Sequence, residues 1–206
     1  MKVKENAVAG YRDELRARII ETASPLFKQR GIRAVRMDEI ASMLTISKRT
    51  LYEVFDNKEA LLLECIKQNK SRIDRLLEKR AAAADNEMEV LIEFLRNQMD
   101  DLQDVCPAYF TDLAKYESVM AYLKADGERR KNKSREFTTR GVEHGYFIPN
   151  LNYDIFNVIS DAMVEYAMKS RLYEQYPIKE IMHTFVTILL RGCCTEKGRR
   201  ILDSVL

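Results

Sequence analysis

The chain has 206 residues, of which 46% are hydrophobic and 32% are charged, so it can bury a medium-sized core and keep a charged surface. No stretch approaches the ~18 apolar residues of a membrane span, and the N-terminus MKVKENAVAGYRDELR lacks the apolar segment of a secretory signal. We therefore expect a cytoplasmic protein with no membrane role. The net charge of +2 is uneven, because residues 1–60 hold twelve Lys/Arg against nine Asp/Glu, a net of +3.

The first two helices are predicted by apolar residues at helical spacing. From about Tyr11 to Arg30 these residues recur every three or four positions, and Gly31 is a natural helix stop. A shorter helix follows, with an apolar stripe formed by Met37, Ile40, Ala41 and Leu44. Its length of about two turns requires a neighbouring helix to pack against.

A third helix is predicted to begin after Ser47, whose hydroxyl can accept the amide of Arg49 or Thr50 as an N-cap. Leu51 and Phe55 are one turn apart and face inward. The opposite, outward face holds Lys48, Arg49, Tyr52 and Glu53. Such a face at the positive end of a helix suits phosphates and base edges. On an arbitrary helix it would be read as a solvated surface.

The remaining sequence predicts helix after helix, so the fold class is all-α. We expect helices over about 58–81, from Asn86 past Leu102, after Pro107, and over about 118–144, with Gly145 as the stop. Two amphipathic helices follow, one from near Tyr153 and one after Pro177, and a last turn or two spans 195–205. No alternation typical of strands is present.

Residues 15–61 resemble the DNA-binding domain of the tetracycline-repressor (TetR) family of bacterial transcription regulators. The resemblance is carried by LFKQRG (residues 26–31), MDEIASMLTISKRTLYEVF (37–55) and NKEALL (57–62). It implies an N-terminal three-helix helix-turn-helix domain, residues 1–57, and a C-terminal helical ligand-binding and dimerisation domain, residues 58–206. The expected function is a DNA-binding repressor that acts on double-stranded operator DNA.

The resemblance also assigns roles within this segment. Lys48, Arg49 and Thr50 would approach base edges and neighbouring phosphates, while Ser47, Tyr52 and Lys58 would clamp the backbone.

Four features depart from the family pattern, and one of them is Val54, which stands where an aromatic residue is common. A phosphate-contacting Thr or Ser is replaced by Val35 and Arg36, so that contact is lost or taken over by the Arg36 guanidinium. Thr45 stands where a turn glycine is common, and a β-branched residue is a poor choice if a positive φ is required. Glu53 replaces a common His, where it would repel phosphate or accept a hydrogen bond from cytosine.

In the family, the two last long helices pair with their mates across a two-fold axis, which implies a homodimer. The apolar residues that would form this interface are Val158, Ile159, Ala162, Tyr166, Ile181, Phe185, Ile188 and Leu189. A dimer also follows from physics, since one short reading helix binds weakly and two can occupy successive major grooves. A small, apolar effector entering behind the fourth helix would change the spacing of the two reading helices and release DNA.

Two other functional classes were weighed. A ferritin-like enzyme is prompted by Glu180-x-x-His183, but such a site needs two of these motifs, and His144 lacks the spacing. A helical adaptor that meets an acidic protein is the second rival. The cysteines at 65, 106, 193 and 194 follow no metal spacing, so reduced thiols are expected, with redox sensing as the alternative. We expect no catalytic residue, no metal site and no cofactor.

Overall fold

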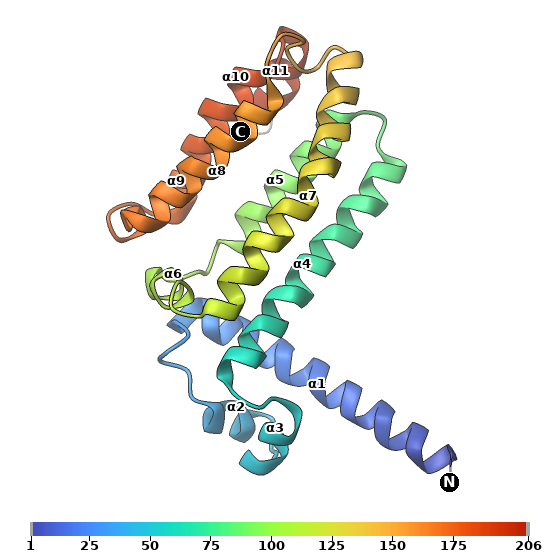
Figure 1. The fold of residues 1–206 in the computed structure, drawn as a ribbon, viewed down its shortest axis with the longest axis vertical. Coiled ribbons are helices and arrows are strands. Elements are labelled where there is room, and N and C mark those ends of the chain that lie inside the picture. Colours follow the sequence, from blue (N-terminus) through green and yellow to red (C-terminus); the bar gives the residue numbers. More distant parts are fainter. Residues whose placement is uncertain (1, 205–206) are drawn as a thin grey trace. The chain divides into compact units, whose positions relative to one another are not determined.

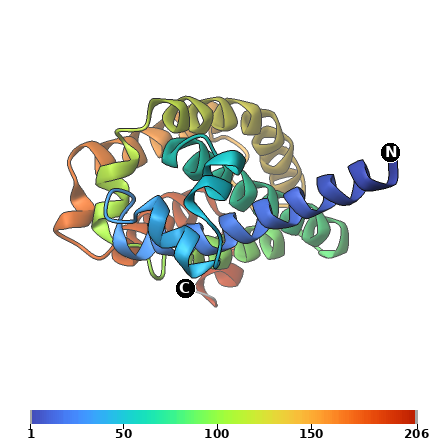
Figure 2. The same cartoon turned by 90° about the horizontal axis from the view of Figure 1, so that it is seen from below.

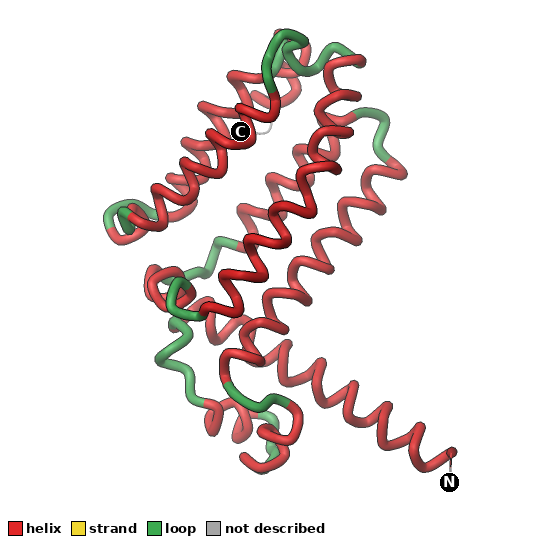
Figure 3. The backbone as a smooth tube through the Cα atoms, viewed as in Figure 1, coloured by secondary structure: helices red, strands yellow, loops and turns green. Residues whose placement is uncertain are grey.

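The computed structural model describes residues 2–204, and it describes side chains from residue 10 onward. Over this range the chain is built from helices joined by short loops (Figure 3). The β-structure recorded among the described residues is one isolated antiparallel bridge between Phe147 and Cys194. The predicted all-α class is confirmed.

The helices are labelled in Figure 1. In chain order they are α1 (Lys2–Arg30), α2 (Met37–Met43), α3 (Lys48–Val54), α4 (Lys58–Ala83), α5 (Glu87–Asp101), α6 (Pro107–Leu113), α7 (Glu117–Glu143), α8 (Tyr153–Lys169), the 3-10 turn η1 (Leu172–Glu174), α9 (Ile178–Phe185), the π-helical turn η2 (Val186–Leu190), α10 (Arg191–Cys193) and α11 (Glu196–Asp203). Within residues 2–204, no helix has the length and apolar character needed to cross a membrane.

The chain divides into two compact units. Unit 1 is Met1–Ser71 with Asp104–Tyr122, and unit 2 is Arg72–Gln103 with Leu123–Leu206. Helices α4 and α7 contribute residues to both units, and α6 belongs to unit 1. The predicted boundary between residues 57 and 58 separates functions rather than packing units, and it stays a prediction.

Unit 1 encloses a core between α1, α2 and α3, which pack against one another (Figure 2). The apolar stripes predicted from spacing face this core. Its fully buried side chains include Ile19, Phe27, Ile40 and Leu51. α2 and α3 have 7 residues each and are marginal alone, so burial of their apolar faces against each other and against α1 is what stabilises them.

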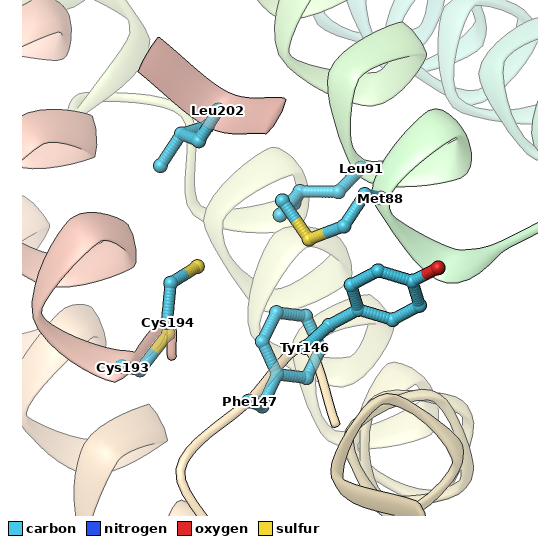
Figure 4. Close-up of a cluster of buried hydrophobic side chains, with 7 residues drawn as sticks. All are labelled: Met88, Leu91, Tyr146, Phe147, Cys193, Cys194 and Leu202. Carbon is cyan, nitrogen blue, oxygen red and sulfur yellow. The ribbon is translucent and has the colours of Figure 1, made fainter. Parts of the chain in front are cut away.

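Unit 2 has its own core, shown in Figure 4. Met88 and Leu91 of α5 meet Tyr146 and Phe147 of the loop after α7, together with Cys193, Cys194 and Leu202 from the end of the chain. The backbone holds this end in place, because the amide of Ile148 donates to the carbonyl of Cys193 at 2.9 Å. All four cysteines are free thiols.

The predicted helix starts are confirmed where a capping residue marks them. The Asn86 side chain accepts from the Glu89 amide at 3.1 Å, and the Asn57 side chain accepts from the Ala60 amide at 2.8 Å. Pro107 occupies the first position of α6, where its missing amide hydrogen costs nothing. Gly145 ends α7 with a φ of +75°.

Two predicted helices differ from the structure. α1 begins at Lys2, well before the predicted start near Tyr11. The helix expected after Pro177 begins at Ile178 as predicted, but it is not a regular α-helix throughout, because the chain passes from α9 through the π-helical turn η2 before α10. A π-turn adds a residue to a helical turn, so side chains after it no longer continue the face of those before it. Ile181 is accordingly buried while Ile188 is exposed.

Candidate nucleic-acid interface

The turn between α2 and α3 is closed by backbone hydrogen bonds. The amide of Thr45 donates to the carbonyl of Ser42 at 3.1 Å, and that of Ile46 to Ala41 at 3.0 Å. Thr45 has a φ of +55°, so the positive φ that disfavours a β-branched residue is present here. The turn therefore carries local backbone strain.

Ser47 starts the reading helix α3 as predicted. Its hydroxyl oxygen accepts from the Thr50 amide at 3.0 Å and lies 2.8 Å from the Thr50 hydroxyl. The cap satisfies one of the unpaired amides of the first turn. One of the two hydroxyl groups donates to the other, so the accepting one keeps its own hydrogen for a phosphate oxygen.

The predicted two faces of α3 are confirmed by exposure. Leu51 and Phe55 are buried, whereas the Arg49 side chain is 89% exposed and Tyr52 is 39% exposed. Lys48 and Glu53 are exposed on the same outward surface. The Lys48 ammonium lies 5.9 Å from the centroid of the Tyr52 ring. The surface formed by Lys48, Arg49, Tyr52 and Glu53 is called the reading face below.

Each cation of the reading face has a carboxylate partner. The Lys48 ammonium lies 3.0 Å from Asp38 of α2, and the Arg49 guanidinium 2.9 Å from Glu53. The hydrogen bond to Asp38 raises the pKa of Lys48, which therefore stays charged. Exposed ion pairs contribute little to stability. Lys48 and Arg49 can therefore exchange their carboxylate partners for phosphate with little loss of stability.

Lys58 starts α4 and is half-buried. Its ammonium donates to the carbonyls of Ile32 at 3.0 Å and Arg33 at 3.3 Å, in the loop between α1 and α2. Burial lowers the pKa of Lys58. An ammonium has three hydrogens, so one remains for a phosphate oxygen. Arg36 lies exposed at the start of α2, and its side chain makes no capping bond there.

Three residues around the reading helix were missed by the sequence analysis. Arg12 of α1 donates to the carbonyl of Glu53 at 2.9 Å, and the Arg16 guanidinium lies 4.7 Å from the centroid of the Phe55 ring. Asp38 is the third. These contacts join residues of different helices, so no local spacing rule reveals them. The i, i+4 repeat of Arg12 and Arg16 is the one signal that α1 presents cations on one side.

The residues predicted for a dimer interface fall into two groups. Val158 and Tyr166 of α8 are 64% and 69% exposed, and Ile159, Ala162 and Ile188 are exposed as well. Ile181 is buried within unit 2, while Phe185 and Leu189 are half-buried. An exposed apolar helix face of this extent is typical of a protein interaction surface.

Comparison with known proteins connects this geometry to characterised proteins. Residues 19–65 match the model of bacterial regulatory proteins of the tetR family. The chain is 23% identical over 206 residues to the HTH-type transcriptional repressor KstR2 of Mycobacterium tuberculosis, covering 92% of this chain and 98% of the repressor. It is 40% identical over 58 residues to the HTH-type transcriptional activator FasR of Mycolicibacterium smegmatis, covering 28% of this chain and 26% of the activator.

Solved structures share the fold at low sequence identity. A transcriptional regulator from Saccharomonospora viridis, solved in complex with choline, superposes with a TM-score of 0.69 at 19% identity. The match covers 89% of this chain and all of that one. The fold therefore extends across both units, while the reading helix lies inside the matched family segment.

Proposed function

Since this chain belongs to the TetR family of bacterial transcriptional regulators and is a DNA-binding regulator rather than an enzyme, we propose that it represses transcription as a homodimer on a palindromic operator. A small, apolar effector releases it from DNA. The reading face of α3 carries the proposal, because its cations are exposed at the start of a capped helix that follows a helix-turn-helix turn.

In this mode α3 lies in the major groove with its N-terminal turn nearest the bases. Lys48 and Arg49 leave Asp38 and Glu53 and bind phosphates or guanine edges. Tyr52 donates its hydroxyl to a phosphate oxygen. Glu53, no longer paired, accepts from a cytosine amino group or repels phosphate, and so contributes to sequence choice. Ser47, Thr50, Lys58 and Arg36 complete the set of contacts.

Dimerisation through α8 is supported by its exposed apolar face, formed by Val158, Ile159, Ala162 and Tyr166, with Ile188 of η2. A two-fold pair uses the same surface on both subunits. Two reading helices then contact half-sites about 34–36 Å apart. The two-fold symmetry of the protein predicts a palindromic operator.

An apolar effector is supported by the aromatic side chains of unit 2. Rings of Phe137, Phe147, Tyr153 and Phe156 follow one another with centroids 5.8 to 6.4 Å apart. The structure of the M. tuberculosis relative is titled a ketosteroid transcriptional regulator, whereas the S. viridis structure holds choline. Thermal-shift measurements with steroids and with choline separate these two chemistries. Stabilisation by choline alone would contradict the apolar class.

Release follows if the effector alters α4, which contributes residues to both units and begins at Lys58. A displacement of α4 changes the separation of the two reading helices in the dimer. The effector needs only to favour the state with the wrong separation.

The function is tested by selecting bound fragments from the source genome and measuring their affinity at several salt concentrations. Lys48→Ala and Tyr52→Ala should each weaken binding roughly tenfold, and Lys48→Ala should lower the salt dependence by about one phosphate contact. Lys131→Ala is a matched control, because Lys131 also forms an exposed ion pair, with Glu128, and belongs to unit 2. Absent or salt-independent binding of wild-type protein would overturn the proposal.

A further inference from the structure

Helix α6 has an unusual position in the chain. It packs in unit 1, yet the chain enters it from α5 and leaves it into α7, and α5 lies in unit 2 together with the longer part of α7. The connections are short, running over residues 102–106 and 114–116. α6 is therefore joined to helices of unit 2 by short segments of main chain.

Both ends of α6 are bonded to the chain between α1 and α2. At its start, the amide of Cys106 donates to the carbonyl of Lys28 at 2.8 Å, which satisfies a carbonyl of the last turn of α1. Near its end, the carboxylate of Asp112 accepts from the amide of Arg33 at 2.8 Å. Asp112 is a buried residue, so its ionised carboxylate depends on such donors.

The loop fits against α6 without spare room. Gly31 has a φ of +86°, and a Cβ added there would lie 3.0 Å from the Cβ of Ala108 and 3.4 Å from the Asp112 carboxylate. The segment Gly31–Arg33, which we call the clamped turn, therefore packs against α6 with little tolerance for displacement.

Lys58 holds the clamped turn from a second direction, through the bonds of its ammonium to Ile32 and Arg33. The negative charge of Asp112 also favours the charged form of Lys58 and so opposes the effect of burial on its pKa. Arg33 is thus bonded through its amide to Asp112 and through its carbonyl to Lys58. One turn joins α6 to the first residue of α4.

We propose that Asp112 is a positioning residue for operator binding, which holds the clamped turn together with Lys58 and thereby fixes how α3 is presented to DNA. The inference rests on the proposed function. Three residues separate the clamped turn from α2, and three separate α3 from Lys58. Both ends of the helix-turn-helix therefore meet at the clamped turn, which Lys58 bonds through its carbonyls and Asp112 of α6 through the Arg33 amide.

Because Asp112 is negatively charged, the clamp and a simple charge effect predict opposite changes in DNA affinity when it is replaced. Removing a carboxylate from a DNA-binding unit ordinarily strengthens DNA binding, because less negative charge faces the phosphates. The clamp predicts the opposite sign for Asp112→Asn, since an amide holds the Arg33 amide and the Lys58 charge less strongly.

The experiment compares Asp112→Asn with wild-type full-length protein on the selected operator and on unrelated duplex. Operator affinity should fall roughly tenfold, as for one misplaced base contact, while affinity for unrelated duplex stays equal or rises and the salt dependence stays unchanged. Asp104→Asn is the control, because it removes the same charge from the exposed loop before α6. This control should bind the operator as tightly as wild type or tighter. Equal or tighter operator binding by Asp112→Asn would overturn the clamp.

A second measurement does not depend on DNA binding. The Arg33 amide lies outside a helix, so without the clamp it would exchange with solvent quickly. Hydrogen exchange should show it protected in wild-type protein and exposed in Asp112→Asn. Fast exchange in wild type overturns the clamp whether or not DNA binds. A wild-type protein with a protected Arg33 amide but no DNA binding would instead overturn the proposed function.

Discussion

Helices α3 and α8 both expose one face, and the chemistry of the two faces differs. α3 exposes cations with nearby carboxylates, whereas α8 exposes Val158, Ile159 and Tyr166 on a helix whose buried residue is Ala167. A charged face is stable in water and can exchange its ion pairs for phosphate. An apolar face of this extent is stable when a second apolar surface covers it. This contrast is the reason that we propose polyanion binding for α3 and self-association for α8.

The largest effect is expected from a charge on the apolar face. Val158→Glu should convert the dimer to a monomer, because a carboxylate buried in an apolar interface lacks a partner. Operator affinity should drop roughly 100-fold, the loss expected when two linked contacts become independent. Light scattering and operator titration measure the two effects.

Val164→Glu is the matched control for that change. Val164 is also an exposed apolar residue of α8, but it lies six residues further on and faces a different direction. The Val164→Glu variant should remain dimeric. If the Val158→Glu variant remains dimeric, the self-association surface does not include this face of α8.

The strained turn before α3 gives the next prediction. Thr45→Gly should stabilise the protein by about 1 kcal/mol, because glycine adopts the positive φ without the penalty of a β-branched side chain. Urea unfolding measures the change. Thr138→Gly, in the interior of α7, should destabilise the protein instead. A loss of stability in both variants would show that the turn is not strained.

An acid-dependent contribution is expected from Glu87 in unit 2, a nearly buried residue whose carboxylate lies 2.8 Å from His144. Burial raises the pKa of Glu87, but the bond to His144, its own backbone amide and the charge of Arg140 outweigh burial and lower it. Because the folded pKa lies below the unfolded value, this stability is present above the unfolded pKa and is lost as the pH falls through the folded one.

Glu87→Gln should therefore cost about 1 kcal/mol at pH 7, as for a hydrogen bond to a charged group, and less near pH 3. Urea unfolding at the two pH values measures the difference. A cost that is equal at both would mean that the Glu87 charge contributes nothing.

The smallest effect concerns the partner of Lys48. Asp38→Asn should raise affinity for unrelated duplex by about threefold at low salt, because the Lys48 ammonium no longer leaves a carboxylate to reach phosphate. The gain should vanish when Lys48→Ala is added, which a double-mutant cycle measures. If the effects of the two substitutions are additive, Asp38 influences DNA binding only through the overall electrostatic field of the protein.

The sequence predicted those features that depend on neighbouring residues. Ser47, Asn57 and Asn86 cap helices through their own side chains, so a short stretch of sequence contains both partners of each bond. The outward face of α3 follows from spacing in the same way. These signals also predicted the reading face. At Thr45 the family pattern, rather than local spacing, raised the question of a positive φ, and the structure has a φ of +55° there.

Features set by distant partners were not predicted. Three such contacts join elements whose packing cannot be derived from local sequence. They pair Lys48 with Asp38, Arg33 with Asp112, and Lys58 with the loop after α1. The π-helical turn η2 breaks a segment with regular apolar spacing. Val186 is buried there, which indicates that packing rather than local preference selects the turn.

The most direct test is a titration of wild-type protein into one selected operator, with stoichiometry and affinity measured between 50 and 200 mM salt as roughly the useful range. The account predicts two protomers per palindromic site and an affinity that falls steeply as salt rises. A single protomer per site, or an affinity that does not change with salt, would contradict it.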